Sequence, residues 1–434
     1  MGGRDPRSII DDGAMRAAQW VAVLVTVGLN ALDGFDVLSI SFASPGIARD
    51  WGIDKATLGW VLSMELLGMA AGSLLLGAVA DKIGRRPTIL GCLVAMAVGM
   101  FGAARAHGVS ELLPWRLLTG LGIGGTLAAI NAAAAELSNR RWRSVAMALM
   151  VIGYPLGGVI GGVCVQKLLT EAGWPAVFVA GGWATAAFLP MVWWLVPESV
   201  AFLDRRRAPG ALAEINRILA RLGQPAAKAL SEAGPETARR SIADVLRPGL
   251  LATTVLVTFG YFAHITSFYF IVKWVPKIVV DMGFDPKTAA GMLTWVSVGG
   301  AIGGALFGLI ATRVALKPLT LIALLAGTMM IVRFGHGGAD LTGLKATLAL
   351  TGLFTNAAIA GFYLLFAQVF PTYVRATGTG FAIGVGRGGA MLAPVIAGYL
   401  FQAGLALQTV ALVMACGSLM AAAALLALKV RAAD

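Results

Sequence analysis

Long apolar runs recur along this sequence, and they restrict its fold more than any other feature. A helix of about 20 apolar residues crosses the roughly 30 Å hydrocarbon core of a bilayer. One or two such runs fit buried helices of a soluble core, but a dozen do not. The sequence therefore predicts an all-α membrane protein with twelve transmembrane helices. The runs lie at residues 18–43, 56–79, 87–105, 111–137, 144–169, 173–196, 249–275, 287–311, 317–334, 343–369, 377–401 and 406–428.

The composition agrees with this reading of the runs. Only 13% of residues are charged and the mean hydropathy is +0.80, whereas soluble domains carry roughly 25% charged residues. The net charge of +12 would indicate nucleic acid in a soluble protein. Here the basic residues lie in short loops, without zinc-ligand spacing or an aromatic-and-basic patch. We therefore expect the protein to lie in a lipid bilayer and not to bind nucleic acid.

Two motifs repeat at one offset, which predicts two related halves. The segment 77–86 after the second run resembles 308–317 after the eighth, and 153–158 in the fifth run resembles 384–389 in the eleventh. Both pairs are 231 residues apart. Duplicated halves of this kind enclose a site at the membrane midplane. We expect halves at residues 1–197 and 249–434, joined by a linker at 198–248 with short helices near 211–222 and 242–246.

Basic residues set the expected orientation. Lys and Arg are more numerous in the loops that share a side with the N-terminus and the linker, and such loops are usually cytoplasmic. Both termini should then lie inside, with the protein in the inner (plasma) membrane. The first run carries two aspartates and is expected to remain as the first helix. The same count places Lys273 on the outer side.

Ionisable residues at membrane depth, well inside the apolar runs and away from their ends, are the candidate functional residues, because charges are costly there. Their positions are Asp33, Asp36, Glu65, Arg116, His264 and Arg387. Asp33 and Asp36 are three residues apart, which places both on roughly one helix face. Asp33 and His264 occupy equivalent positions of the repeat, whereas Arg387 corresponds to Leu156. A purely structural ion pair is the alternative role for each of them.

The sequence offers no basis for enzymatic chemistry. It contains no phosphate loop, nucleophile elbow or His-rich metal motif. Its three cysteines, Cys92, Cys164 and Cys416, all lie in apolar runs at wide spacing, which fits neither a disulfide framework nor a metal site. We expect no metal and no cofactor.

Four motifs resemble those of the major facilitator superfamily. They are Gly77-x-x-x-Asp81-Lys-x-Gly84-Arg85-Arg86, Arg116-x-x-x-Gly120-x-Gly122-x-Gly124, Gly153-Tyr-Pro155-Leu-Gly157-Gly158 and Pro197-Glu198-Ser199. The resemblance implies two six-helix halves that alternate in access. In the first motif, Asp81 suits the positive N-terminus of a helix in the other half, and Arg85 can pair with Glu136. These three residues are the expected cytoplasmic gate, closed while the outside is open.

Two further motifs resemble the aromatic acid:proton symporter family. They are Asp33-Gly-Phe-Asp36 and Gly386-Arg387-Gly-Gly-Ala-x-x-Ala-Pro394, and the segment Phe370-Pro371-Thr372-x-x-Arg375 fits the same group. The resemblance implies a symporter that imports a benzoate-like, hydroxylated or methoxylated acid with protons. A proton-driven exporter of drug-like compounds and a passive channel are the alternatives. We expect a monomer.

Side-chain chemistry assigns the roles within that hypothesis. An Arg guanidinium matches the fork of a carboxylate, so Arg387 is the first candidate for the substrate and Arg116 the second. Asp33 and Asp36 are the first candidates for proton coupling, because a carboxyl group out of water favours its neutral form. Asp36 is the expected carrier and Asp33 its modulator near His264, with Glu65 and His264 themselves in reserve. The expected apolar walls for an aromatic ring are Tyr154, Tyr261, Phe268, Tyr269, Trp295 and Phe362.

Overall fold

The computed structural model describes residues 5–231, 242–337, 340–371 and 374–428, and its regular elements there are all helices. Twelve of the helices are long and apolar enough to cross a membrane, which confirms the fold predicted from the apolar runs. They are α2 (Ala17–Trp51), α3 (Lys55–Ile83), α4 (Arg85–Ala104), α5 (Val109–Leu137), α6 (Arg143–Glu171), α7 (Pro175–Leu195), α11 (Pro248–Asp281), α12 (Pro286–Ile310), α13 (Leu316–Gly335), α14 (Leu341–Val369), α15 (Arg375–Gln402) and α16 (Leu407–Ala427).

Equivalent helices of the two halves begin in the same way. The Asp54 side chain accepts a hydrogen bond from the backbone N–H of Thr57 at the start of α3, and Asp285 does the same for Thr288 at the start of α12. Such caps satisfy N–H groups that have no partner within the helix. The bond from Thr57 also lowers the pKa of the Asp54 carboxyl. Asp54 and Asp285 are related by the repeat offset, so the duplication extends to the helix caps.

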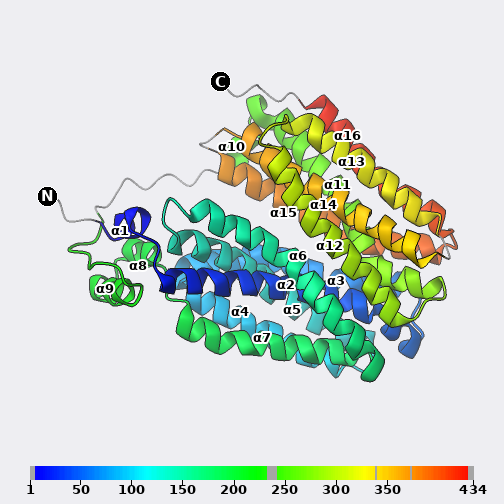
Figure 1. Ribbon diagram of the computed structural model, residues 1–434, viewed down its shortest axis with the longest axis horizontal. Coiled ribbons are helices and arrows are strands. Elements are labelled where there is room, and N and C mark those ends of the chain that lie inside the picture. Colours follow the sequence, from blue (N-terminus) through cyan, green and yellow to red (C-terminus); the bar gives the residue numbers. More distant parts are fainter. Residues whose placement is uncertain (1–4, 232–241, 338–339, 372–373, 429–434) are drawn as a thin grey trace.

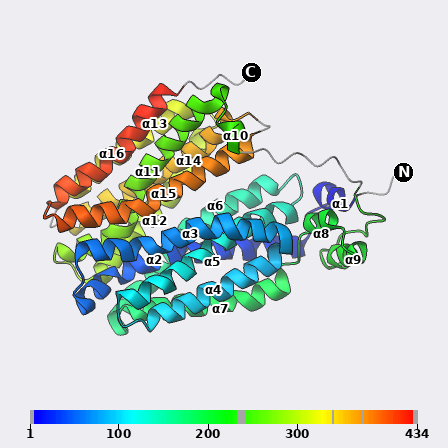
Figure 2. The ribbon, with the colours of Figure 1, turned by 180° about the vertical axis from the view of Figure 1, so that it is seen from behind.

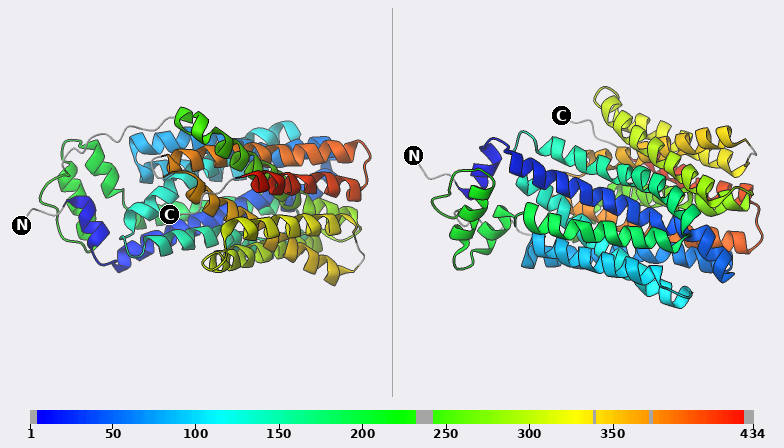
Figure 3. Two further views of the ribbon diagram at one scale, coloured as in Figure 1. Left: turned by 90° about the horizontal axis from the view of Figure 1, so that it is seen from above. Right: turned by 60° about the horizontal axis from the view of Figure 1, so that its bottom comes forward.

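The helices form two bundles, α2–α7 and α11–α16, which converge at one end and diverge at the other (Figures 1 and 2). The diverging end carries the short helices α1 (Pro6–Asp12), α8 (Val200–Arg206) and α9 (Ala211–Arg221). We call this end the linker face, and the converging end the opposite face. Figure 3 shows these short helices beyond the end of the N-terminal bundle.

The short helices are attached to the N-terminal bundle. Gln224, just after α9, donates hydrogen bonds to the carbonyl of Ala14 and to Gln19 at the start of α2. Arg143 at the start of α6 forms an ion pair with Asp11 of α1. The linker helices expected near 211–222 and 242–246 are present as α9 and as α10 (Ile242–Val245). Helices α1 and α8 were not anticipated.

The two halves are in close contact at the opposite face. Three hydrogen bonds join α3 to α15 there: Lys55 N to Gln402 Oε1 at 3.3 Å, Trp60 Nε1 to Tyr399 OH at 3.4 Å, and Ser63 Oγ to the carbonyl of Met391 at 2.7 Å. Glycines allow this approach, since a Cβ on Gly398 would lie 2.6 Å from the Lys55 carbonyl oxygen. No side chain fits between α3 and α15 at that level.

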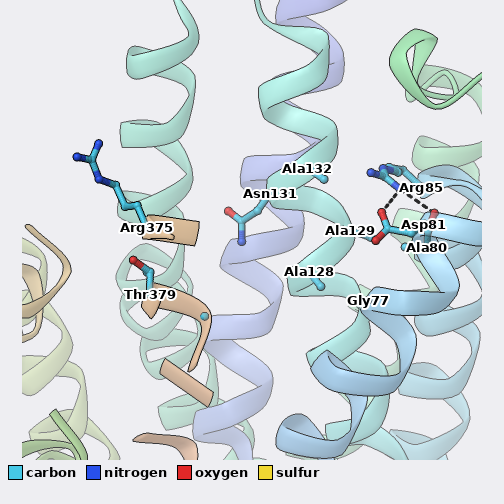
Figure 4. A pocket seen from close by; sticks show the side chains of 11 residues that line it. Gly77, Ala80, Asp81, Arg85, Ala128, Ala129, Asn131, Ala132, Arg375 and Thr379 are labelled. Carbon is cyan, nitrogen blue, oxygen red and sulfur yellow. Dashed lines mark hydrogen bonds and ion pairs between the residues drawn. The ribbon is translucent and has the colours of Figure 1, made fainter. Parts of the chain in front are cut away.

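A cavity of about 1150 Å³ separates the halves at the linker face. Helices α3 and α5 form one wall, and the first turns of α15 form the other (Figure 4). The lining residues are Gly77, Ala80, Asp81, Arg85, Ala128, Ala129, Asn131, Ala132, Arg375, Thr379 and Gly380. The structure is therefore a form that is open at the linker face and closed at the opposite face.

Candidate functional site

Glu65 lies at the centre of a buried ionic cluster between the halves. Its Oε1 is 2.5 Å from Nη2 of Arg116 on α5, and its Oε2 is 3.5 Å from Nζ of Lys273 on α11. All three side chains are fully buried. Burying an ion is costly unless it is paired, so one carboxylate serves two cations here. The cluster joins the N-terminal half, through α3 and α5, to the C-terminal half, through α11.

The structure corrects the position of Lys273, which the charge count placed on the outer side. The residue lies within α11, and its Nζ also donates to the backbone carbonyl of Val37 at 2.5 Å. The apolar run was taken to end at residue 275, where Pro276 follows, yet α11 continues through Pro276 to Asp281. Proline is tolerated in transmembrane helices because neighbouring groups satisfy the freed carbonyl. Lys273 is thus a third membrane-depth cation beside Arg116 and Arg387.

Arg116 is enclosed by its own half. Its Nη2 lies 3.3 Å from the backbone carbonyl of Asp36 and 3.3 Å from Oγ of Ser39, both on α2. Its guanidinium also lies 5.2 Å from the centre of the Phe178 ring on α7. Together with Glu65, these contacts tie α2, α3, α5 and α7 to one cation. This placement favours an architectural role for Arg116 over direct substrate contact.

Asp33 and Asp36 are both buried on α2 but lie in different surroundings. Within the described part of the chain, none of their four carboxyl oxygens has a hydrogen-bond partner. Oδ1 of Asp36 lies near Gly181 of α7, inside the N-terminal bundle. Asp33 interacts electrostatically with Asp36 and, across the boundary between the halves, with Arg387 on α15. An unpaired buried carboxylate is costly, so burial disfavours the ionised form at both positions, and at Asp33 the cation Arg387 opposes this effect.

Arg387 crosses from α15 to α3. Its Nη1 donates to the backbone carbonyl of Met69 at 2.8 Å and to Oγ of Ser73 at 2.5 Å. One to two turns farther toward the linker face, Gly77 and Ala80 of α3 face the cavity from one side and Thr379 from the other. The half-buried guanidinium therefore lies where the contact between α3 and α15 ends and the cavity begins.

The six predicted aromatic residues divide into two groups of three. Tyr154 of α6 and Tyr269 of α11 interact through their hydroxyl groups across the halves, and Tyr269 interacts electrostatically with Arg387. Tyr154 and Phe268 line a second cavity of about 30 Å³, which is too small for an aromatic ring and holds no more than about one water. Tyr154, Phe268 and Tyr269 are thus gathered between the halves, near Arg387.

The other three aromatic residues lie mainly outside this region, although the Tyr261 ring adjoins Gly386, the residue before Arg387 on α15. Tyr261 and Phe362 pack edge to face, with ring centres 5.7 Å apart, inside the C-terminal bundle. Trp295 is 44% exposed on α12. It lies on the side of α12 away from Leu293 and Val296, which line the small cavity.

His264 is likewise enclosed in its own half. Its Nδ1 lies 2.9 Å from Oγ of Ser418 on α16, and its Nε2 lies 3.0 Å from the carbonyl of Thr355 on α14. Both ring nitrogens are therefore occupied by groups of the C-terminal bundle. The repeat makes His264 equivalent to Asp33, but the ring contacts of His264 stay within its own half, whereas Asp33 interacts electrostatically with Arg387 of the other half.

The predicted gate residues form one cluster at the linker face. Arg85 lies 2.9 Å from Asp81 and 3.3 Å from Glu136, and all three belong to the N-terminal half. Figure 4 shows Arg375 and Thr379 of α15 on the far side of the cavity. In this open form the cluster and the start of α15 are apart, so contact between them would require the halves to close here.

Glu198 supports that cluster, a role that sequence reasoning did not assign. Its carboxylate accepts hydrogen bonds from the backbone N–H groups of Arg85 at 2.9 Å and Arg86 at 3.3 Å, at the start of α4. Burial raises the pKa of the Glu198 carboxyl. The negative group lies at the positive end of the helix, which is favourable. The sequence signal was the Pro197-Glu198-Ser199 motif, which reveals its partner only in three dimensions.

The sequence is similar to a known family and to several characterised transporters. The family model of the Major Facilitator Superfamily matches residues 26–342. A gallate transporter of Pseudomonas putida is 31% identical, over 98% of this chain and 94% of its own length. The 4-hydroxybenzoate transporter PcaK of Pseudomonas putida is 31% identical, over 89% of this chain and 87% of its own.

The fold also matches a solved structure. The xylose transporter XylE from E. coli, in a partially occluded inward open conformation, superposes with a TM-score of 0.70. The match covers 94% of this chain and 97% of the other at 17% identity, so it speaks for the fold alone.

Proposed function

This chain belongs to the Major Facilitator Superfamily, and we propose that it imports an aromatic carboxylate together with a proton. The family matches confirm the superfamily resemblance drawn from the motifs, and they identify a transporter rather than an enzyme. Coupling to protons, the direction of transport and the substrate within the class are the proposal.

The placement of Arg387 is the observation that carries the proposal. Its two hydrogen-bond acceptors, the Met69 carbonyl and the Ser73 hydroxyl, are neutral. Across the described residues, no carboxylate lies within the 4.0 Å ion-pair distance of its guanidinium. A half-buried cation without a paired anion, about two helical turns along α15 from the lining of a large cavity, suits a carboxylate ligand. Tyr269 and Tyr154 nearby suit the aromatic ring.

The relatives support the same substrate class. Gallate and 4-hydroxybenzoate are both hydroxylated benzoates, with one carboxylate on an aromatic ring. One guanidinium and a pair of tyrosines match that combination of an anion, a ring and hydroxyl groups. We therefore favour a hydroxylated benzoate over drug-like compounds without a carboxylate, which would leave Arg387 without a counter-charge.

Asp33 provides a physical route for proton coupling. Arg387 attracts the ionised form of Asp33 electrostatically. A substrate carboxylate that occupies Arg387 offsets this attraction, so Asp33 then favours the protonated form. Proton and substrate are thereby loaded together. When the substrate leaves at the linker face, Arg387 is free to attract Asp33 again and the proton is released.

We place the linker face in the cytoplasm and the protein in the inner membrane. The basis is the excess of Lys and Arg in the loops on that side. On this orientation the structure is the inward-open form, from which the substrate leaves.

Uptake into proteoliposomes tests the proposal. Radiolabelled 4-hydroxybenzoate should accumulate when the outside is made acidic, and a protonophore should abolish the accumulation. Saturable uptake whose rate and extent do not change with the pH gradient would exclude proton coupling. Accumulation in exchange for protons moving the other way would indicate the exporter instead. No binding of any hydroxylated benzoate would exclude the substrate class.

A further inference from the structure

We propose that Lys273 is a second binding residue for the substrate carboxylate, which it binds only while the opposite face is open. This inference rests on the proposed transport of a carboxylate. In the present form Lys273 is engaged by Glu65 and by the Val37 carbonyl. In the other form, the substrate would take their place.

The partners of Lys273 belong to the other half. Lys273 lies on α11 of the C-terminal half, whereas Val37 is on α2 and Glu65 on α3 of the N-terminal half. Opening the opposite face moves α11 away from α2 and α3. Both polar contacts of the ammonium are then broken in one step.

When the halves separate, Glu65 keeps a cationic partner, whereas Lys273 loses its anionic one. Arg116, from the same half, lies 2.5 Å from Glu65 and remains beside it when the halves part. The Arg116–Glu65 pair is neutral as a unit. Lys273, by contrast, would be left as an ammonium without an anion at membrane depth, which is costly.

The C-terminal half has no acidic residue at membrane depth that could replace Glu65 as the counter-ion of Lys273. Residues 249–434 contain no Glu, and the only Asp residues there are Asp281, Asp285, Asp340 and Asp434. Asp281 pairs with Lys277 at the end of α11, and Asp285 and Asp340 cap helices. The membrane-depth anions all belong to the N-terminal half. An arriving carboxylate is therefore the natural counter-ion of Lys273 in the open form.

The position of Lys273 suits first contact from the opposite face. It lies eight residues before the end of α11 at Asp281, or roughly 12 Å at 1.5 Å per residue. Arg387 lies fifteen residues before the end of α15 at Gln402, farther from that face. Phe268 and Val272, within two turns of Lys273 on α11, line the small cavity. The ammonium thus adjoins apolar groups that would contact an aromatic ring once this cavity widens.

Closure would then transfer the substrate. As the halves meet at the opposite face, Glu65 returns to Lys273 and competes with the bound carboxylate. The nearest other membrane-depth cation on the C-terminal half is Arg387, beside the cavity that leads to the linker face. The Glu65–Lys273 pair would thereby make closure and forward movement of the substrate a single event.

The proposal predicts an effect that differs between the two faces. Exchange of 4-hydroxybenzoate is measured in sealed membrane vesicles of both orientations, which protease access to the linker identifies. Lys273→Gln should raise the KM at the opposite face about tenfold or more, the loss expected for a charge-assisted contact. The KM at the linker face should change less than about twofold. Equal shifts at both faces, or none, would overturn the proposal.

Three further variants separate binding from folding and from general charge. Lys277→Gln removes a cation one turn away on α11 and should leave both KM values unchanged. Lys273→Met is a second test should Lys273→Gln not fold. Glu65→Gln removes the competitor and should lower the KM at the opposite face, whereas a rise would contradict the exchange of partners. If the wild-type protein exchanges no hydroxylated benzoate, the proposed function itself is wrong. If the wild-type protein exchanges it normally and the Lys273 variants have unchanged KM values, only the role of Lys273 is wrong.

Discussion

Arg116 and Lys273, from opposite halves of the protein, contact different oxygens of the same buried carboxylate, Glu65. The contacts are unequal, at 2.5 Å for Arg116 and 3.5 Å for Lys273. Arg116 has further partners on α2, and its guanidinium adjoins the Phe178 ring. The Arg116–Glu65 contact therefore stabilises the N-terminal half by itself. The Lys273–Glu65 contact joins the two halves and forms only while the opposite face is closed.

This inequality predicts different effects on stability. Arg116→Gln leaves Glu65 without its partner in the same half and should destabilise the protein by roughly 3–5 kcal/mol. Lys273→Gln leaves the Arg116–Glu65 pair intact and should cost much less. Thermal unfolding in detergent checks the order. A larger loss for Lys273→Gln would contradict the division of roles.

Arg387→Lys should bind substrate at least about tenfold more weakly. The charge is retained, but the planar fork that matches a carboxylate is lost. Titration calorimetry with 4-hydroxybenzoate measures the effect. Arg313→Lys, outside the transmembrane helices near the linker face, is the matched control and should bind normally. Wild-type affinity in Arg387→Lys would remove Arg387 from the substrate site.

Asp81→Asn should slow transport while leaving expression and substrate binding largely intact. Asp81 and Glu136 hold Arg85 at the linker face, and the open cavity there must close in each cycle. Losing the charge weakens the cluster and its attraction to the positive N-terminus of α15. Initial uptake rates, compared with Glu214→Gln on α9, check this. A full rate in Asp81→Asn would rule out the gate.

The sequence contained enough information for the architecture. Apolar runs locate transmembrane helices because the bilayer demands length and hydrophobicity together. The repeat relates features as fine as the caps Asp54 and Asp285. The charged residues of the site were also visible as charges at membrane depth, with the exception of Lys273, which lies two residues before the predicted end of its apolar run and was counted with the outer loops.

The directions of the side chains could not be read in the same way. Asp33 and Asp36 share a helix face by spacing, yet the packing places the Asp36 carboxyl near Gly181 of α7, whereas Asp33 interacts electrostatically with Arg387 of the other half. His264 is equivalent to Asp33 in the repeat, but its partners lie on α14 and α16. Each outcome depends on how neighbouring helices are rotated, which only the packed structure determines.

Gly398→Leu should prevent closure of the opposite face. Even a Cβ at this position would lie 2.6 Å from the Lys55 carbonyl and 3.2 Å from the Cα of Gly59. Transport should fall about fivefold or more, since overpacking of a tight contact costs about 1–3 kcal/mol. Binding from the opposite face should persist. Gly91→Leu, where a Cβ meets nothing within 4 Å, is the control. Normal transport in Gly398→Leu would contradict the need for this contact.

Asp33→Asn and Asp36→Asn together locate the coupling proton. Asn imitates the neutral form of the carboxyl permanently, so a variant of the coupling residue can bind substrate but cannot release a proton. It should lose accumulation driven by a pH gradient, yet still exchange substrate when both sides are loaded, because exchange needs no net proton movement. We expect the larger loss in Asp33→Asn, since Asp33 interacts with Arg387 across the halves.

The measurement is uptake of labelled 4-hydroxybenzoate into proteoliposomes, with and without an imposed gradient, beside exchange at equal concentrations. Loss of accumulation with exchange retained identifies the carrier, because a variant that is merely misfolded loses both. Asp285→Asn, at a helix cap outside the membrane spans, should retain both activities. If both α2 variants still concentrate the acid in response to the gradient, helix α2 does not carry the proton. Glu65 then becomes the next candidate, since His264 is enclosed by groups of its own half.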